Sequence, residues 1–265
     1  MQTNDHIDIT IAYDLPFEAR YPIGPVFSSG NDISLIAEIQ QKPERYRTAL
    51  VRVFELLTNL AATGALSGTD LEPWKSGLRI DPSPIELEDS MRFQFINSRV
   101  DEGVLIILSS MLLAQREAIS LNALEVSLPG RQVMQRLRSD PTTPSTYPGA
   151  YRKIPFELMD ENPEGGGYTF VAELRQPLQE SNQKHLEQAL RRWVDVILAG
   201  GYGLAPIPPQ ESYIEPDSDF VTSFANMIEW TVFKLRADPA CVLSLVNIFV
   251  NFHYQCQELV SLTIS

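Results

Sequence analysis

Two strand-like segments far apart in the chain share one pattern of apolar and polar positions. Residues 33–41 read ISLIAEIQQ and residues 168–176 read YTFVAELRQ, so their apolar positions coincide and Ala, Glu and Gln recur at matching places. Both segments are predicted strands because they are short, apolar and rich in β-branched and aromatic residues. The match predicts that the chain contains two copies of one structural unit.

An amphipathic helix is predicted after each of these strands. Its apolar residues recur at i, i+3, i+4 and i+7, which places them on one helix face. In the first copy they are Tyr46, Ala49, Leu50, Val53, Phe54, Leu57 and Leu60, and in the second Leu186, Ala189, Leu190, Trp193, Val194 and Ile197. Arg52 and Arg192 lie on these equivalent helices. The second helix is expected to end at Ala199-Gly200-Gly201, where glycine takes the left-handed C-cap conformation.

The rest of each copy also repeats in order. Ile80-Asp81-Pro82 matches Ile214-Glu215-Pro216, and strands are predicted at 91–98 and 228–235. Arg99-Val100-Asp101 then corresponds to Arg236-Ala237-Asp238, with the aspartate expected as a helix N-cap. Strongly apolar helices are predicted at 102–117 and 239–256, and closing strands at 121–128 and 259–264.

Each copy therefore has the order βαββαβ, and an extra strand precedes it at 7–13 and at 154–159. This order predicts an α+β protein of two tandem ferredoxin-like repeats, with antiparallel sheets that carry helices on one face. The predicted domains are residues 1–129 and 153–265. A Pro- and Thr-rich linker, residues 130–152, joins them, because this stretch is stiff and poor in core residues.

The helices at 102–117 and 239–256 lack a wide polar stripe. One side of each is expected to pack on the sheet of its own copy, and the other side needs a second cover. We expect the two helices to share a layer within one chain, as a monomer with two packed repeats; homodimerisation is the second choice.

Charge and composition exclude several classes of protein. The net charge is −13 with a pI of about 4.7, so the average surface repels phosphate and we expect no nucleic-acid partner. The longest apolar runs are shorter than the ~20 residues that span a bilayer, so no membrane contact is expected. The N-terminus lacks the pattern of a secretory signal, and Cys241 and Cys256 stand too far apart on one helix to pair. These features predict a cytoplasmic protein.

The sequence contains little catalytic or metal-binding chemistry. Its three histidines, His6, His185 and His253, are scattered, and no Cys-x-x-Cys or His-Glu-x-x-His occurs. His253 and Cys256 stand three apart on one predicted helix, but two ligands without a third make a poor metal site. Gly-x-Ser-x-Gly, Gly-x-Gly-x-x-Gly and the P-loop are also absent. We therefore expect no catalytic residues, no metal and no cofactor, and an enzyme is the less favoured reading.

The repeated polar residues are the candidates for ligand or partner binding. Glu38 and Glu173 lie on equivalent strands, and Arg99 and Arg236 lie at equivalent strand ends. One interpretation places these four around a pseudo-symmetric cleft between the copies. The other, which we favour, is that each copy uses them in ion pairs at the edge of a sheet or helix.

Two classes of function remain open. The first is an acidic protein-binding scaffold, such as an inhibitor or immunity-type protein that masks a basic target. The alternative is a small-molecule binding protein or an enzyme that uses a groove between the repeats, where pockets often form. A flat acidic or apolar face would support the first, and a deep pocket with convergent acids the second.

Overall fold

The structure is a computed structural model. It describes residues 18–22, 26–27, 33–39, 44–66, 81, 85–87, 90–96, 99–100, 102–115, 119, 121–127, 134–136, 154–161, 167–203, 211–216, 222–238 and 240–265. Within these residues the protein has an α+β fold with four helices, which confirms the predicted class. No helix among them is long and apolar enough to cross a membrane.

The first half contains both predicted helices and several short strands besides the predicted ones. The helices are α1 (Glu44–Ala61) and α2 (Glu102–Ala114). The strands are β1 (Glu18–Pro22), β2 (Val26–Phe27), β3 (Ile33–Ile39), β4 (Ile85–Glu86), β5 (Ser90–Phe95), β6 (Arg99–Val100), β7 (Leu121–Ser127) and β8 (Met134–Arg136).

The second half contains the corresponding elements. Its helices are α3 (Glu180–Leu198) and α4 (Ala240–Gln255). Its strands are β9 (Glu157–Asp160), β10 (Tyr168–Leu174), β11 (Ile214–Pro216), β12 (Thr222–Phe224), β13 (Met227–Leu235) and β14 (Leu259–Ile264). The closing strand has the predicted bounds, and Asp238 caps α4 as expected, because its Oδ1 accepts a hydrogen bond of 2.8 Å from the backbone N–H of Ala240.

The two main sheets have matching strand orders. The first runs β4-β5-β3-β7-β1-β8, and the second runs β11-β13-β10-β14-β9, with β12 paired to β13. In each sheet the strand that precedes the unit joins parallel to the closing strand, β1 to β7 and β9 to β14. Both sheets are therefore mixed, and the prediction of antiparallel sheets was wrong at this edge.

The structure adds two strands, β1 and β8, near the predicted extra strand and linker of the first half. The predicted strand at 7–13 lies outside the described residues, and β1 at Glu18–Pro22 takes the position next to the closing strand. Most of the predicted linker also lies outside them, but β8 falls within it and pairs antiparallel with β1. Part of the segment between the halves thus extends the first sheet.

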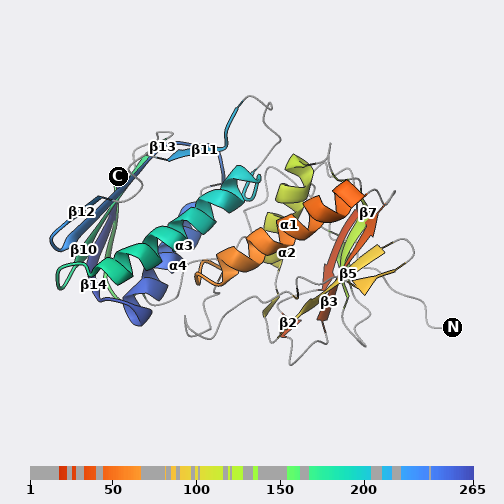
Figure 1. Ribbon diagram of the computed structural model, residues 1–265, viewed down its shortest axis with the longest axis horizontal. Helices are drawn as coiled ribbons and strands as arrows, with labels where there is room; N and C mark the ends of the chain where they lie inside the picture. Colours follow the sequence, from red (N-terminus) through yellow and green to blue (C-terminus); the bar gives the residue numbers. More distant parts are fainter. Residues whose placement is uncertain are drawn as a thin grey trace.

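The helices lie between the two sheets (Figure 1). The first sheet is at one end of the molecule, the second at the other, and α1 to α4 fill the space between. One contiguous cluster of buried apolar side chains runs through both halves. Val104 to Leu113 of α2 are buried without exception, and in α4 only Leu243 is exposed between Ala240 and Phe252. Both apolar helices are therefore covered on both sides within one chain.

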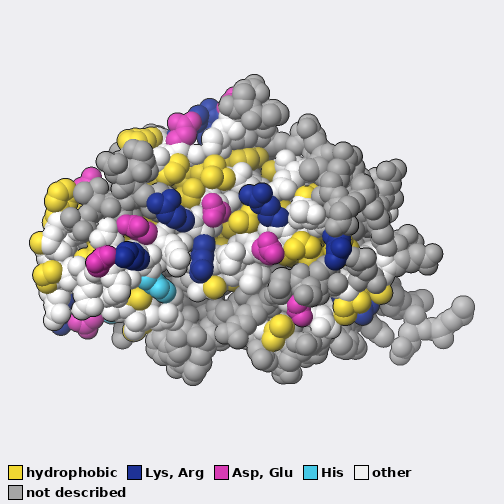
Figure 2. Space-filling model, viewed as in Figure 1, with side chains coloured by type: hydrophobic (Ala, Val, Ile, Leu, Met, Phe, Trp, Pro, Cys, Tyr) yellow, Lys and Arg dark blue, Asp and Glu magenta, His cyan; other side chains and the backbone are white. Residues whose placement is uncertain are grey.

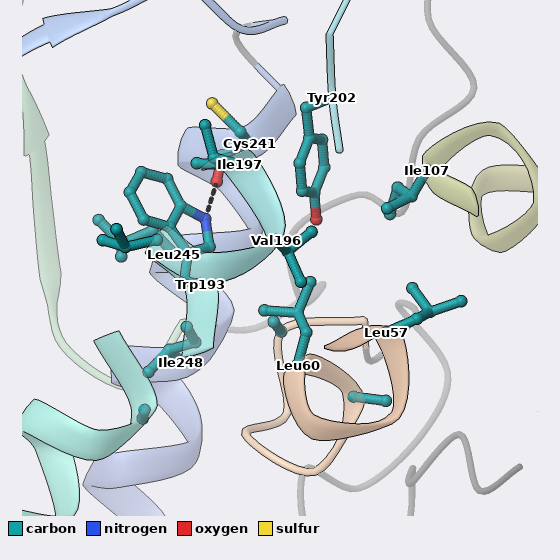
Figure 3. Close-up of a cluster of buried hydrophobic side chains, with 14 of the residues drawn as sticks. Leu57, Leu60, Ile107, Trp193, Val196, Ile197, Tyr202, Cys241, Leu245 and Ile248 are labelled. Atoms are coloured by element: carbon teal, nitrogen blue, oxygen red, sulfur yellow. Dashed lines mark hydrogen bonds between the residues drawn. The ribbon is translucent and has the colours of Figure 1, made fainter. Parts of the chain in front are cut away.

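The halves meet differently from the predicted pairing of the two apolar helices. The most extensive helix contact between them joins α1 to α3, rather than α2 to α4. Figure 3 shows the junction, where Leu57 and Leu60 of α1 and Ile107 of α2 approach Val196 and Tyr202 of the second half. Trp193 anchors α3 to α4 here, because its Nε1–H donates to the carbonyl of Cys241 at 3.0 Å.

Two glycine turns make reciprocal contacts across the junction. Gly64 (φ +83°) ends α1 and lies against Asn251 of α4, whereas Gly200 (φ +88°) ends α3 and lies against Ala114 of α2. A side chain at either position would meet the helix opposite and would need a left-handed backbone, so glycine suits both. Next to the first turn, Asn247 Nδ2 donates a 3.1 Å hydrogen bond to the carbonyl of Ala65. Each half thus fits the end of its first helix against the second helix of the other half.

Candidate functional site

Among the described residues, no helix packs on the outward side of the second sheet. Along β13, Ile228, Trp230 and Val232 are buried against the helices, so the alternating Met227, Glu229 and Phe233 project outward. Strand register joins this strand to its neighbours in two rows that cross the sheet. One row is Glu157, Ser261, Glu173, Met227 and Phe224, and the other is Met159, Thr263, Val171, Glu229 and Thr222. We call these ten residues with Phe233 the outer sheet face.

Three large apolar side chains of the outer sheet face are strongly exposed. Phe224 keeps 61% of its surface accessible, Met227 42% and Phe233 64%. In Figure 2, apolar side chains likewise appear along the left margin, over the second sheet. Single exposed apolar residues are common, but Met227 and Phe224 are direct cross-strand partners. The outer sheet face therefore has an apolar side next to the β12–β13 hairpin.

The charged groups of the outer sheet face are acidic. Glu157, Glu173 and Glu229 are all exposed, and none takes part in an ion pair that the structure describes. The nearby bases are matched elsewhere: Arg175 pairs with Glu258 at 3.0 Å and Lys234 with Glu215 at 3.1 Å. The outer sheet face therefore combines apolar surface with uncompensated negative charge.

Glu38 and Glu173 occupy equivalent places but do not converge. Ala37 and Ala172 beside them are buried, so each glutamate is exposed on the outward side of its own sheet. Each also precedes an irregularity in the pairing with the closing strand, between Glu38 and Ile39 and between Glu173 and Leu174. Because the two sheets lie at opposite ends of the molecule, these glutamates do not line a common cleft (Figure 1).

Of the two arginines, Arg236 lies apart from Glu173 in the second half. Arg236 follows β13, forms an ion pair with Glu211 and donates its backbone N–H to the carbonyl of Tyr213 at 2.7 Å. Arg99 belongs to β6, which pairs with β2, and its side chain lies outside the described residues. Arg236 thus forms an ion pair, with Glu211 rather than with Glu173.

A groove does lie between the halves, where α1, the end of α2 and the end of α3 meet. Its volume is about 770 Å³, and it is lined by Thr48, Ala49, Arg52, Leu56, Gln115, Asp195, Leu198 and Ala199. Arg52 and Asp195 are both exposed, and the structure describes no ion pair between them. The groove brings one positive and one negative side chain together, not a pair of acids.

The residues weighed for metal or nucleophilic chemistry have structural roles. His253 Nδ1 accepts a 3.0 Å hydrogen bond from the backbone N–H of Leu259, which uses the lone pair at that nitrogen. Cys241 is fully buried, and burial raises the pKa of its thiol. Within the described ranges, no three His, Cys, Asp or Glu side chains are grouped to hold a metal ion.

The outer sheet face was not predicted, because the strand prediction at 228–235 did not separate the two faces of β13. The alternation of Ile228, Trp230 and Val232 was the available signal, since it assigns Met227 and Phe233 to the opposite side. The sequence did anticipate the place of the groove, but not its residues. Gln115, for example, lines the groove because the end of α2 lies next to the other half, and the sequence does not show this packing.

Comparisons with known proteins do not assign the chain to a family. No family model matches the chain, and no curated protein matches it. Among solved structures, a predicted insulinase family protease from Yersinia pestis aligns at 10% identity over 81% of this chain and 65% of its own, with a TM-score of 0.18. A DyP-type peroxidase from Cellulomonas bogoriensis aligns at 8% identity over 99% of this chain and 94% of its own, with a TM-score of 0.19. This chain spans about two thirds of the protease chain, and TM-scores this low support no shared fold or activity.

Proposed function

We propose that this protein is a protein-binding scaffold whose outer sheet face binds a basic surface of a partner protein. The observation that carries the proposal is the combination of exposed Phe224, Met227 and Phe233 with three exposed glutamates that form no ion pair among the described residues, all on one sheet face. Apolar surface gains about 25 cal/mol per Å² when a partner removes it from water. The glutamates select for a partner of opposite charge.

The charge of the whole chain favours the same kind of partner. At a net charge of −13 its field attracts cationic surfaces over distances of about one Debye length, ~8 Å at physiological salt. Such attraction mainly accelerates association and disfavours acidic competitors, while the apolar contacts slow dissociation. An inhibitor or immunity-type protein that masks a basic target would use both effects.

The finer description of the fold belongs with this proposal. We infer that the chain consists of two tandem ferredoxin-like repeats related by duplication. The shared strand order, the irregularity after Glu38 and Glu173, and the reciprocal contacts of Gly64 and Gly200 support it. Superposition of residues 33–127 on residues 168–264 tests the inference: equivalent strands should overlay, and a different path of β4 and β11 would contradict it.

A photo-crosslinking experiment tests the binding function. A photoreactive amino acid replaces Met227 in the full chain, which is expressed in the source cell and irradiated, and the crosslinked protein is identified by mass spectrometry. The matched control carries the same probe at Asn122, an exposed residue of β7 in the first sheet. We expect the probe at 227, and not the probe at 122, to capture one basic protein.

Variants then link that protein to the outer sheet face. Against the purified partner, Glu173→Lys and Phe233→Ser should each weaken binding at least tenfold, and the loss in Glu173→Lys should shrink at high salt. Glu55→Lys, the same charge change on the exposed side of α1, should leave the affinity within about twofold. Equal capture at 227 and 122, or unchanged affinity in both outer-face variants, would exclude this face as the binding surface.

A further inference from the structure

We propose that the groove between the halves is a ligand site for a small zwitterion, a molecule with a cationic amine and an anionic carboxylate separated by an apolar chain. This site is independent of the outer sheet face, because it lies among the helices and not on the outward side of a sheet. Basic and acidic side chains alternate across this region of the surface, above α3 and α1 (Figure 2).

The position and size of the groove suit a small ligand. Ligand sites occur preferentially between domains and usually have volumes of roughly 300–1,000 Å³. The groove, at about 770 Å³, lies within this range and draws its lining from both halves. Because α1 and the end of α2 form one wall and the end of α3 forms the other, a bound molecule would contact both halves at once.

The two charged side chains of the groove come from opposite halves. Arg52 lies on α1 and Asp195 on the last turn of α3, and both are exposed to solvent. Neither forms an ion pair that the structure describes, so both can bind a ligand without breaking such a contact. The guanidinium suits a carboxylate, which it can hold through two parallel hydrogen bonds, and the aspartate suits an amine.

The backbone strengthens the negative end of the site. The groove lies at the C-terminal ends of α2 and α3, where the helix dipole leaves partial negative charge, and neither helix has a basic residue in its last turn. An ammonium group near Asp195 would be attracted by both the carboxylate and these helix ends. A simple anion would be repelled by them, which favours a ligand that carries both signs of charge.

Apolar lining residues account for the middle of the ligand. Leu56 and Leu198 face the groove together with the methyl groups of Ala49 and Ala199, and Leu198 keeps 50% of its surface exposed at the end of α3. An alkyl chain between the two charges would cover this apolar surface. Thr48 and Gln115 add polar groups at the rim, where a ligand's remaining polar atoms would meet water.

The test uses unbranched ω-amino acids, from 4-aminobutanoate to 8-aminooctanoate, titrated into the full chain by calorimetry. We expect saturable binding at one site, with one chain length preferred because the distance between Arg52 and Asp195 is set by the fold. Hexanoate and hexylamine, which each lack one charge, should bind at least tenfold more weakly than the preferred amino acid.

Variants assign the two ends of the ligand. Arg52→Gln should remove the preference for the amino acid over hexylamine, and Asp195→Asn should remove its preference over hexanoate. The charge-exchanged Arg52→Glu, Asp195→Lys double variant should bind more tightly than Arg52→Glu alone. Glu55→Gln, on α1 but outside the groove lining, should bind as the unmodified protein does. No binding by any member of the series, or binding unchanged in Arg52→Gln and Asp195→Asn, would overturn the proposal.

Discussion

The side chain of His253 forms a contact that depends on its protonation state. Its Nδ1 accepts the backbone N–H of Leu259, which requires an unprotonated Nδ1 where α4 leads into β14. Burial lowers the pKa of this imidazole below its ordinary value; the charge of Arg175 adds to this effect, and the carboxylate of Glu258 opposes it. The folded protein therefore binds this proton less readily than the unfolded chain.

We expect stability to fall as the pH drops below the ordinary histidine value of 6.5 and toward the lowered pKa of His253. The stability that this group contributes is complete above that range, where the imidazole is neutral in both states. Urea unfolding of the protein and of His253→Asn at several pH values measures the effect. Asparagine can accept the same N–H without titrating, so the variant should show a smaller loss on acidification; equal losses would contradict this account.

Asp238 gives a second prediction, concerning the start of α4. Its carboxylate accepts the N–H of Ala240, so Asp238→Ala should remove the cap and cost about 1 kcal/mol of unfolding free energy. Asp238→Asn keeps a capping oxygen and should stay within a few tenths of a kcal/mol of the unmodified protein. Denaturant melts at neutral pH compare the three proteins. Equal destabilisation by both substitutions would show that the negative charge, not the cap, is what matters.

At the scale of elements, the turns that end α1 and α3 fix how the halves meet. Gly64→Ala and Gly200→Ala should each destabilise the protein by about 1–3 kcal/mol, because a β-carbon there needs an unfavourable backbone and crowds the opposite helix. Asn59→Ala, at an exposed position of α1, is the control and should have little effect.

A double-mutant cycle separates the cost of the left-handed backbone from the cost of crowding the opposite helix. Ala114→Gly removes the β-carbon that a side chain at position 200 would meet, so it should recover part of the cost of Gly200→Ala. Additive costs in the double variant would mean that the backbone conformation alone explains the glycine.

Periodicity predicted the helices and half of the strands that the structure describes, because burial on one side leaves a regular trace in the sequence. Leu259–Ile264 and the starts of β3 and β10 agree with it, and Asp238 was identified as a cap from its position before Pro239. The addition of β1 and β9 parallel to the closing strands was not predictable, because local patterns do not encode which strand joins which edge. β8 was missed for the same reason, since a short strand within a Pro-rich segment carries almost no apolar period.

The candidate site was less accessible from the sequence than the fold. The matched segments placed Glu38 and Glu173 at corresponding positions of two strands, but those strands belong to sheets at opposite ends of the molecule. The exposed Phe233 could be recognised only once Trp230 and Val232 were known to face the helices. Arg52 and Asp195 share a groove because α1 and α3 pack together, a contact that depends on tertiary structure alone.

At the scale of the whole molecule, the buried helices lie between the two sheets and join them through one shared hydrophobic core. Leu112 of α2 and Phe249 of α4 are each only 1% exposed within a cluster that spans both halves. Leu112→Asp or Phe249→Asp would place an unpaired charge there, which should cost several kcal/mol and unfold much of the protein at room temperature. Denaturant melts and light scattering measure the outcome. Variants that remain folded at unchanged size would show that water reaches these helix sides.

The thiols of Cys241 and Cys256, near the two ends of α4, allow the opening of that unit to be timed without introducing a new cysteine. Cys256 is partly accessible just after the end of the helix. Cys241 is buried near its start, where the Cys241 carbonyl accepts the Nε1–H of Trp193. A thiol reagent should therefore modify the first within the native state and the second only after the helices separate. The modification of Cys241 could require either separation of the two halves or complete unfolding. If separation is enough, a ligand bound in the groove would slow the modification of Cys241 and leave the modification rate of Cys256 unchanged. Labelling followed by mass spectrometry would then report, in one sample, both local accessibility and the lifetime of the joined halves.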